Sequence, residues 1–352
     1  MGEAQVNVAT FGEILLRLAT PKKERFVQAN SFDVDYGGGE YNVAVSLAQF
    51  GVPTKFITAL PSNEIGEAAM NRIRSFGINT SAIRRMGGER IGLYFLEHGA
   101  AMRSSKIVYD RAESAISRIQ PGIFDWEDAF SGIDWFHFTG ITPALSKSAA
   151  ETTMEAAKAA KELGLIVSAD MNYRKNLWSP DEAQSVMKPL MEYVDIALGN
   201  EEDAEKCLGV IAEGQDVTAG ELNPDAYRNV IDNLISNFGF SKVGITLRDS
   251  ISASDNNWSA VYLDTDKEIK GGGVMHIGAK YPVHMVDRVG GGDAFSAGII
   301  YGNINNFTPE ETLNFAVASS ALAHTIHGDL NLVSLSEVQA IVEGDTSGRV
   351  QR

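Results

Sequence analysis

Three glycines followed by an aspartate, Gly290-Gly291-Gly292-Asp293, are the residues that could do chemistry most directly. Glycine lacks a Cβ and tolerates positive φ, so its backbone N–H groups can close around an oxyanion. A helix starting at Asp293 would add its N-terminal dipole at the same point. The Asp293 carboxylate could then take a proton from a hydroxyl while a phosphoryl group is held nearby. The structural alternative is that Asp293 caps the helix after a tight turn.

A second glycine-rich segment, Gly37-Gly38-Gly39-Glu40-Tyr41-Asn42, lies far upstream. It runs into an apolar helical pattern that stops at Gly51, a suitable residue just past a helix C-terminus. By itself this segment predicts only a flexible turn before a helix.

Taken together, the two segments resemble the signatures of the PfkB (ribokinase-like) carbohydrate kinases. The C-terminal signature of that family is D-T-x-G-A-G-D-x-F, and it is matched here at Asp287, Gly290, Gly292, Asp293 and Phe295. Two positions depart from it, because Arg288 replaces the usual Thr and Gly291 replaces the usual Ala.

The resemblance assigns roles to both segments. It implies that Asp293 is the catalytic base and that the amides around Gly290, Gly291 and Gly292 form the anion hole, with Gly290 and Gly292 also meeting the nucleotide. It further implies substrate contacts at Gly38, Gly39 and Asn42, and it places Glu40 in the pocket lining. The acidic residue in Gly-Gly-x-Glu-x-Asn is typical of the 2-keto-3-deoxygluconate kinases of the family.

Alternating residues predict four short strands, near 13–18, 32–36, 93–96 and 106–111, outside the β–α order of the chain. In the first of them, Ile14, Leu16 and Leu18 form the apolar face. Tyr109 and Arg111 would share one face of the last strand. An arginine facing a sugar pocket could hold a carboxylate in bidentate fashion. On an exposed edge strand it could instead serve solubility.

The run Tyr-x-Arg-x-x-Ser-Ala from Tyr109 to Ala115 resembles the segment with which 2-keto-3-deoxygluconate kinases hold a sugar acid. The resemblance implies substrate contacts at Tyr94, Tyr109 and Arg111, with the carboxylate on Arg111.

From Asp134 onward, strand and helix patterns alternate, which predicts a mainly parallel sheet with ligands at the carboxyl ends of its strands. Polar residues at this edge resemble further PfkB motifs. The resemblance implies that Arg174 reaches substrate or phosphate, and that Asn200 and Asp203 serve a hydrated Mg²⁺ through water. An acidic first helical turn would explain Asp203 equally well. The remaining residues implied are nucleotide contacts at Asn172, Arg174, Asn200, Thr246 and Arg248, and a substrate contact at Asp329.

The expected fold is a three-layer α/β/α, ribokinase-like domain with a mainly parallel central sheet and a small β-sheet lid. The resemblance implies one kinase domain over residues 1–344, with lid strands inserted at about 13–36 and 91–112. Residues 345–352 are expected to be a disordered tail. Lid sheets of this family often pack against each other, so a homo-oligomer through the lid is also expected.

Composition excludes several partners. The net charge of −16 argues against nucleic acid or an anionic membrane. Cys207 is the only cysteine, so no internal disulfide can form, and no apolar run reaches membrane-spanning length. His324 and His327 have no third ligand nearby, so a helix-end pair is favoured over a metal site. These features predict a cytoplasmic protein.

The sequence therefore predicts an ATP-dependent kinase that phosphorylates a primary hydroxyl, most closely that of 2-keto-3-deoxygluconate at its 6-position. ATP and Mg²⁺ are the expected cofactors, and a monovalent cation such as K⁺ is a further candidate. A fructokinase or another sugar kinase is the alternative within the class. A regulatory protein that binds sugar or nucleotide without turnover is the alternative outside it, because Arg288 and the glycine-free segment after Thr246 depart from the family pattern.

Overall fold

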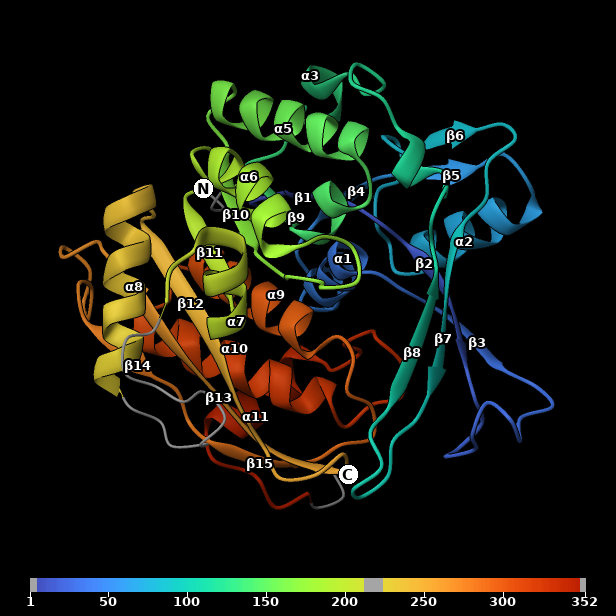
Figure 1. The fold of residues 1–352 in the computed structure, drawn as a ribbon. Coiled ribbons are helices and arrows are strands. Elements are labelled where there is room, and N and C mark those ends of the chain that lie inside the picture. The colour runs from blue at the N-terminus through green and yellow to red at the C-terminus, as the bar shows by residue number, and fades with distance from the viewer. Residues whose placement is uncertain (1–4, 212–223, 349–352) are drawn as a thin grey trace.

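The structure, a computed structural model, describes residues 5–211 and 224–348 (Figure 1). Its central sheet has the order β14-β13-β12-β11-β10-β9-β1-β4, with β15 also paired to β13. In this sheet the strands β12, β11, β10, β9, β1 and β4 pair in parallel, whereas β13 pairs antiparallel with its neighbours. The strands are β1 (Val8–Phe11), β4 (Thr54–Ile57), β9 (Trp135–Thr139), β10 (Ile166–Asp170), β11 (Ile196–Gly199), β12 (Lys242–Ser250), β13 (Asp255–Asp264), β14 (Met275–Ile277) and β15 (Tyr281–His284).

Helices cover both faces of this sheet, so the predicted three-layer fold is confirmed (Figure 1). One layer contains α1 (Gly39–Gln49), α9 (Gly291–Ile304), α10 (Pro309–Ala323) and α11 (Leu335–Val342). The opposite layer contains α3 (Trp126–Ala129), α5 (Lys147–Glu162), α6 (Pro180–Met191) and α8 (Pro224–Phe238). Short helical segments complete the chain: α2 (Glu64–Arg74), α4 (Ile141–Ala144), α7 (Glu201–Asp203), η1 (Ile116–Arg118) and the π-helical η2 (Ala204–Leu208).

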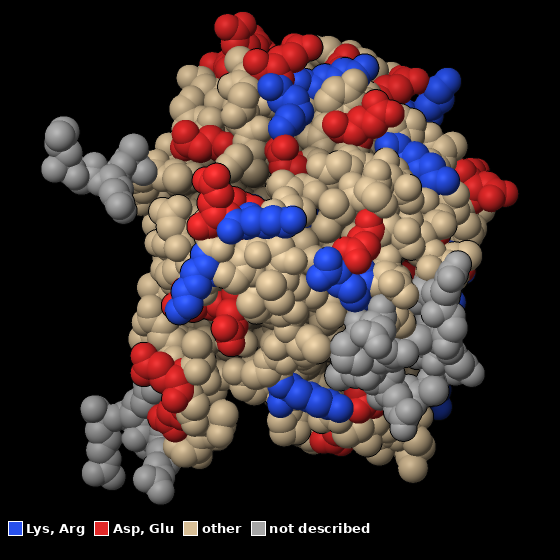
Figure 2. Space-filling model, turned by 90° about the vertical axis from the view of Figure 1, so that its left-hand side faces the viewer, with Lys and Arg blue, Asp and Glu red and all other residues tan. Residues whose placement is uncertain are grey.

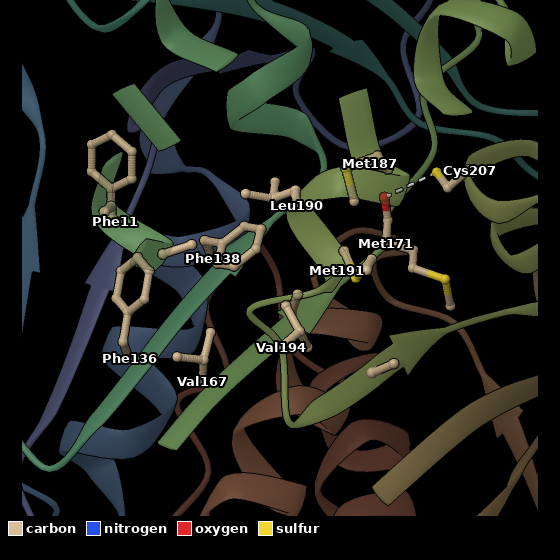
Figure 3. Packing of buried hydrophobic residues seen from close by; sticks show 14 of the residues in the cluster. Phe11, Phe136, Phe138, Val167, Met171, Met187, Leu190, Met191, Val194 and Cys207 are labelled. Carbon is tan, nitrogen blue, oxygen red and sulfur yellow. Dashed lines mark hydrogen bonds between the residues drawn. The ribbon is translucent and has the colours of Figure 1, made fainter. Parts of the chain in front are cut away.

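The two layers have separate hydrophobic cores because successive residues of a strand point to opposite faces. In β9, Trp135 packs with the α9 and α10 side, whereas Phe136 and Phe138 pack with the α5 and α6 side. Figure 3 shows this second core, in which Phe138 lies near Leu190 of α6 and Phe136 lies farther from it. The strands that end at the active site are thus held on both faces.

A separate four-stranded sheet lies beside the main body, on the right of Figure 1. Its order is β3-β2-β7-β8, and the four predicted lid strands are confirmed as β2 (Leu15–Ala19), β3 (Asp33–Gly37), β7 (Gly92–Glu97) and β8 (Lys106–Asp110). A third, two-stranded sheet joins β5 (Ala59–Pro61) to β6 (Arg84–Met86).

One sequence prediction about the lid strands was wrong in detail. The apolar face expected for β2 was Ile14, Leu16 and Leu18. Ile14 is buried just before the strand, but the residues buried along β2 itself are Leu15, Arg17 and Ala19. In the central sheet, β12 stays paired with β13 as far as Ser250 and carries Arg248 on this last part.

The surface in Figure 2 shows acidic and basic side chains interspersed, so this face offers no continuous basic surface for a nucleic-acid backbone. Within residues 5–211 and 224–348, no helix has the length and apolar character needed to cross a membrane. Of the tail predicted from residue 345 onward, residues 349–352 lie outside the described part of the chain.

Candidate active site

A cavity of about 920 Å³ lies where the carboxyl edge of the sheet, the N-termini of α1 and α9 and the lid sheet meet. Nearly all residues predicted from the sequence contribute to its lining, although they come from distant parts of the chain. These are Gly38, Gly39, Asn42, Tyr94, Tyr109, Arg111, Asn172, Arg174, Asn200, Asp203, Thr246, Arg248, Gly290, Gly291, Gly292, Asp293 and Asp329. Glu40 is the exception.

Asp293 lies in the first turn of α9, at the bottom of this cavity. The helix begins at Gly291, two residues earlier than expected, and its N-cap is Gly290 in the left-handed region at φ 84°. Asp293 is therefore not the helix cap. Asn42 Nδ2, from the first turn of α1, donates a 2.7 Å hydrogen bond to Asp293 Oδ2. Burial raises the pKa of Asp293 to about 6, against the opposing effect of the Asn42 hydrogen bond.

The start of α9 presents free N–H groups beside this carboxylate. The first N–H groups of a helix have no intrahelical partner, and here the helical hydrogen bonds begin with Ala294 N donating to Gly290 O. A Cβ at Gly290 would lie 2.1 Å from Asp329 O, which together with its positive φ explains the glycine. A Cβ at Gly292 would have no atom nearer than Asp170 Oδ2 at 3.8 Å, so this glycine borders open space.

His324 explains why Gly291 stands where the family signature has Ala. A Cβ at Gly291 would lie 2.2 Å from His324 Nε2. The imidazole is buried against Trp258, with ring centroids 4.7 Å apart, and burial lowers the pKa of His324 to about 4. A neutral histidine thus occupies the space that an alanine methyl would need.

We expect Gly291→Ala to destabilise the fold by about 1–3 kcal/mol, the usual cost of overpacking. In a His324→Ala background the same change should cost nothing, because alanine favours the helix over glycine by about 1 kcal/mol. Chemical denaturation of the four proteins in this double-mutant cycle measures the coupling. Gly292→Ala is the matched control. An equal cost of Gly291→Ala in both backgrounds would contradict the assignment.

The N-terminus of α1 forms the opposite wall. Gly38 has φ 151°, and a Cβ there would lie 2.1 Å from Glu13 O, so the lid connection passes directly over this glycine. Glu40 was expected in the pocket lining, but the structure buries it completely and it does not line the cavity. It accepts hydrogen bonds from Thr139 N at 3.0 Å and from Thr142 Oγ1 at 2.7 Å. Burial raises the pKa of Glu40 to about 7. Its role is to fix α1 to the end of β9.

On the lid side, Arg111 is buried and forms an ion pair of 2.6 Å with Glu13. Strand β8 ends at Asp110, so Arg111 turns inward, and its guanidinium lies 4.8 Å from the centre of the Tyr109 ring. The Tyr94 and Tyr109 rings are 5.9 Å apart. A carboxylate, an arginine and two phenols therefore face one part of the cavity.

A second buried ion-pair cluster connects the lid to the segments that precede and face the start of α9. Arg17 of β2 pairs with both Asp287 and Asp329. Tyr94 Oη donates to Asp329 Oδ1 at 2.5 Å. Asp329, expected to contact substrate, is thus already held by two lid residues at the cavity wall.

Sequence reasoning missed Glu13 and Arg17, although both are charges inside otherwise apolar segments. That anomaly is the signal that could have found them, since a buried charge is retained only where it has a partner.

At the sheet edge, Asn172 has a positive φ of 42° and its N–H donates to Asp170 Oδ1 at 3.2 Å. Asp203 is engaged by the backbone, since its oxygens accept from Asn200 N at 2.9 Å and Tyr173 N at 2.8 Å. Burial raises the pKa of Asp203 to about 6. Together, Asn200 and Asp203 form a capping box at the start of α7, which gives both residues a structural role.

The described residues contain no group of three His, Cys, Asp or Glu side chains arranged to hold a metal. Glu201 and Glu202, which follow Asn200 in the sequence, also line the cavity.

The chain is similar to known carbohydrate kinases along most of its length. The model of the pfkB family carbohydrate kinases matches residues 5–231 and 259–334. A 2-dehydro-3-deoxygalactonokinase of Haloferax volcanii is 30% identical over 345 residues, covering 97% of this chain and 98% of the relative. A 2-dehydro-3-deoxygluconokinase of Thermoproteus tenax is 28% identical over 335 residues, covering 93% and 91%.

Solved structures give the same result. The crystal structure of a 2-dehydro-3-deoxygluconokinase from Thermotoga maritima has a TM-score of 0.91 at 47% identity, covering 97% of this chain and all 100% of that one. A putative ribokinase II from E. coli in complex with ATP and Mg²⁺ has a TM-score of 0.78 at 20% identity and covers 96% and 99%, which shows the shared fold. The chain therefore belongs to the PfkB family of carbohydrate kinases.

Proposed function

We propose that this carbohydrate kinase transfers the γ-phosphoryl group of ATP to the primary hydroxyl of 2-keto-3-deoxygluconate, also called 2-dehydro-3-deoxygluconate. The observation that carries the proposal is the position of Asp293. Its carboxylate lies in the first turn of α9, next to unpaired helix N–H groups and within 2.7 Å of Asn42. A proton acceptor and an anion hole in one place are what phosphoryl transfer to a hydroxyl requires.

The reaction follows from this geometry. Asp293 takes the proton of the substrate hydroxyl as its oxygen attacks the γ-phosphorus, and the bond from that phosphorus to the bridging oxygen breaks to release ADP. The N–H groups of Gly291, Gly292 and Asp293 point to where negative charge gathers on the transferred group. Magnesium, when bound with ATP, supplies further charge neutralisation at the phosphates.

The sugar-acid specificity is supported by the lid. Arg111 lies beside the cavity with its Nε buried and without a hydrogen-bond partner among the described residues. A substrate carboxylate would satisfy this donor, and Tyr94 and Tyr109 would contact the sugar chain. The relatives in Thermotoga maritima and Thermoproteus tenax carry the name of the gluconate kinase, and the Haloferax relative that of the galactonate kinase. The galactonate epimer is therefore the second candidate substrate.

ADP release with ATP and Mg²⁺ tests the proposal on a panel of 2-keto-3-deoxygluconate, its galactonate epimer, fructose, ribose and gluconate. We expect turnover on the keto-deoxy acids alone. Turnover on fructose or ribose would support the kinase activity but refute the proposed binding of a substrate carboxylate by Arg111. Sugar binding by titration without any ADP release would instead support a regulatory protein.

A further inference from the structure

The cavity contains positive charge that the protein itself leaves unpaired. The arginines that line it are Arg111, Arg174, Arg248 and Arg288. Arg111 is paired with Glu13, whereas the other three form no ion pair within residues 5–211 and 224–348. The cavity wall also carries eight carboxyl groups, so an anionic ligand is indicated only where arginines without an ion pair lie together.

Arg248 and Arg288 lie on one wall of the cavity, at the β12–β13 hairpin. Arg248 is opposite Trp258 in the pairing of these strands. Arg288 precedes the anion hole, and its guanidinium donates a 2.9 Å hydrogen bond to Asn256 Oδ1 on β13. The hairpin pairing continues to Ser250, and Arg248 lies on this part of β12 and lines the cavity. Burial lowers the pKa of Arg288, and repulsion from Arg248 lowers it further.

Unpartnered polar atoms surround the same wall. Trp258 Nε1, His324 Nε2 and Ser296 Oγ are buried without a hydrogen-bond partner among the described residues. The residues that carry them are 5%, 3% and 1% exposed, and all three line the cavity. Buried polar groups are normally hydrogen-bonded, so these atoms point independently to a polar ligand at this wall.

We infer that Arg248 and Arg288 bind the phosphate chain of the donor and fix its terminal phosphorus over the start of α9. This inference rests on the proposed kinase function. The alternative anion, the sugar carboxylate, has its own arginine on the lid side, Arg111. Arg288 stands two residues before Gly290 and is therefore next to the anion hole rather than to the lid strands. Arginine suits phosphate because its planar fork donates two parallel hydrogen bonds.

The test measures binding by titration calorimetry of the full chain with inorganic tripolyphosphate, MgATP and adenosine. Arg288→Ala and Arg248→Ala should each weaken tripolyphosphate and MgATP by roughly 10- to 100-fold, the range for one charged hydrogen-bonding group. Adenosine binding should not change. Arg84→Ala is the matched control, since Arg84 is exposed on β6 and does not line the cavity.

The possible results separate this inference from the proposed function. Tripolyphosphate affinity equal to wild type in both variants would overturn the inference, even if sugars are phosphorylated normally. Arginine-dependent tripolyphosphate binding would support it, even if none of the sugars in the panel is turned over. Arg288→Lys, which keeps the charge but loses the fork, should fall between wild type and Arg288→Ala. Because Arg248 is exposed, Arg248→Ala should fold, and its affinity for tripolyphosphate tests the inference even if Arg288→Ala does not fold.

Discussion

Replacing Asp293 by asparagine should lower kcat by roughly 10²- to 10⁴-fold, the usual contribution of a general base. Asparagine has the same shape, and its amide oxygen can still accept from Asn42, whose Nδ2 lies 2.7 Å from Asp293 Oδ2. The variant should therefore fold and bind sugar acid as the wild type does, but it cannot take the proton of the attacking hydroxyl. A steady-state assay of ADP release measures the loss.

The pH dependence of kcat/KM tests the role of the Asp293 carboxylate independently. Burial raises the pKa of Asp293 to about 6, and a base works only when deprotonated. Wild-type kcat/KM should therefore be constant above this pH and fall about tenfold per unit below it. The residual activity of Asp293→Asn should lack this acid limb. Near-normal turnover of the variant, or an unchanged acid limb, would assign the base to another residue.

The second large effect concerns Arg111. Arg111→Gln should raise the KM for the keto-deoxy acid by roughly 10- to 100-fold with a smaller change in kcat, because a charged hydrogen bond to the substrate carboxylate is lost. It should also destabilise the protein by about 3–5 kcal/mol, since Glu13 would be left as a buried, unpaired charge. Kinetics and thermal unfolding measure the two effects separately.

The double variant Glu13→Gln/Arg111→Gln separates substrate binding from stability. Removing both charges should recover most of the lost stability, because neither amide leaves an uncompensated charge. The raised KM should persist, since the carboxylate still lacks its partner. Recovery of KM along with stability would show that Arg111 acts only by keeping the lid folded.

Much of this architecture could be predicted because local signals agree with the fold. The alternation of strands and helices after Asp134 gives the mainly parallel sheet, and the lid strands follow from their alternating residues. The buried face of β2 could not be predicted from apolar residues alone. Arg17 occupies that face only because Asp287 and Asp329, some 300 residues away in sequence, pair with it.

The site shows the same division. The two glycine-rich motifs determine their local backbone geometry, so Asp293, Asn42 and Gly290 could be placed in one site from the sequence. The pairing of Glu13 with Arg111 and the contact of His324 with Gly291 depend on packing between distant segments. Glu40 shows the opposite case. Its motif predicts a residue of the pocket lining, whereas its side chain is buried and accepts hydrogen bonds from Thr139 and Thr142. Sequence motifs therefore predicted which residues line the cavity better than which residues hold them in place.

Phosphorus NMR of the reaction product tests the central claim most directly. After incubation of 2-keto-3-deoxygluconate with ATP and Mg²⁺, we expect a new phosphate monoester signal coupled to two methylene protons, as a phosphorylated primary hydroxyl requires. Its formation should depend on Asp293. A signal coupled to a single methine proton, or no new monoester alongside rapid turnover of fructose, would contradict the proposed function.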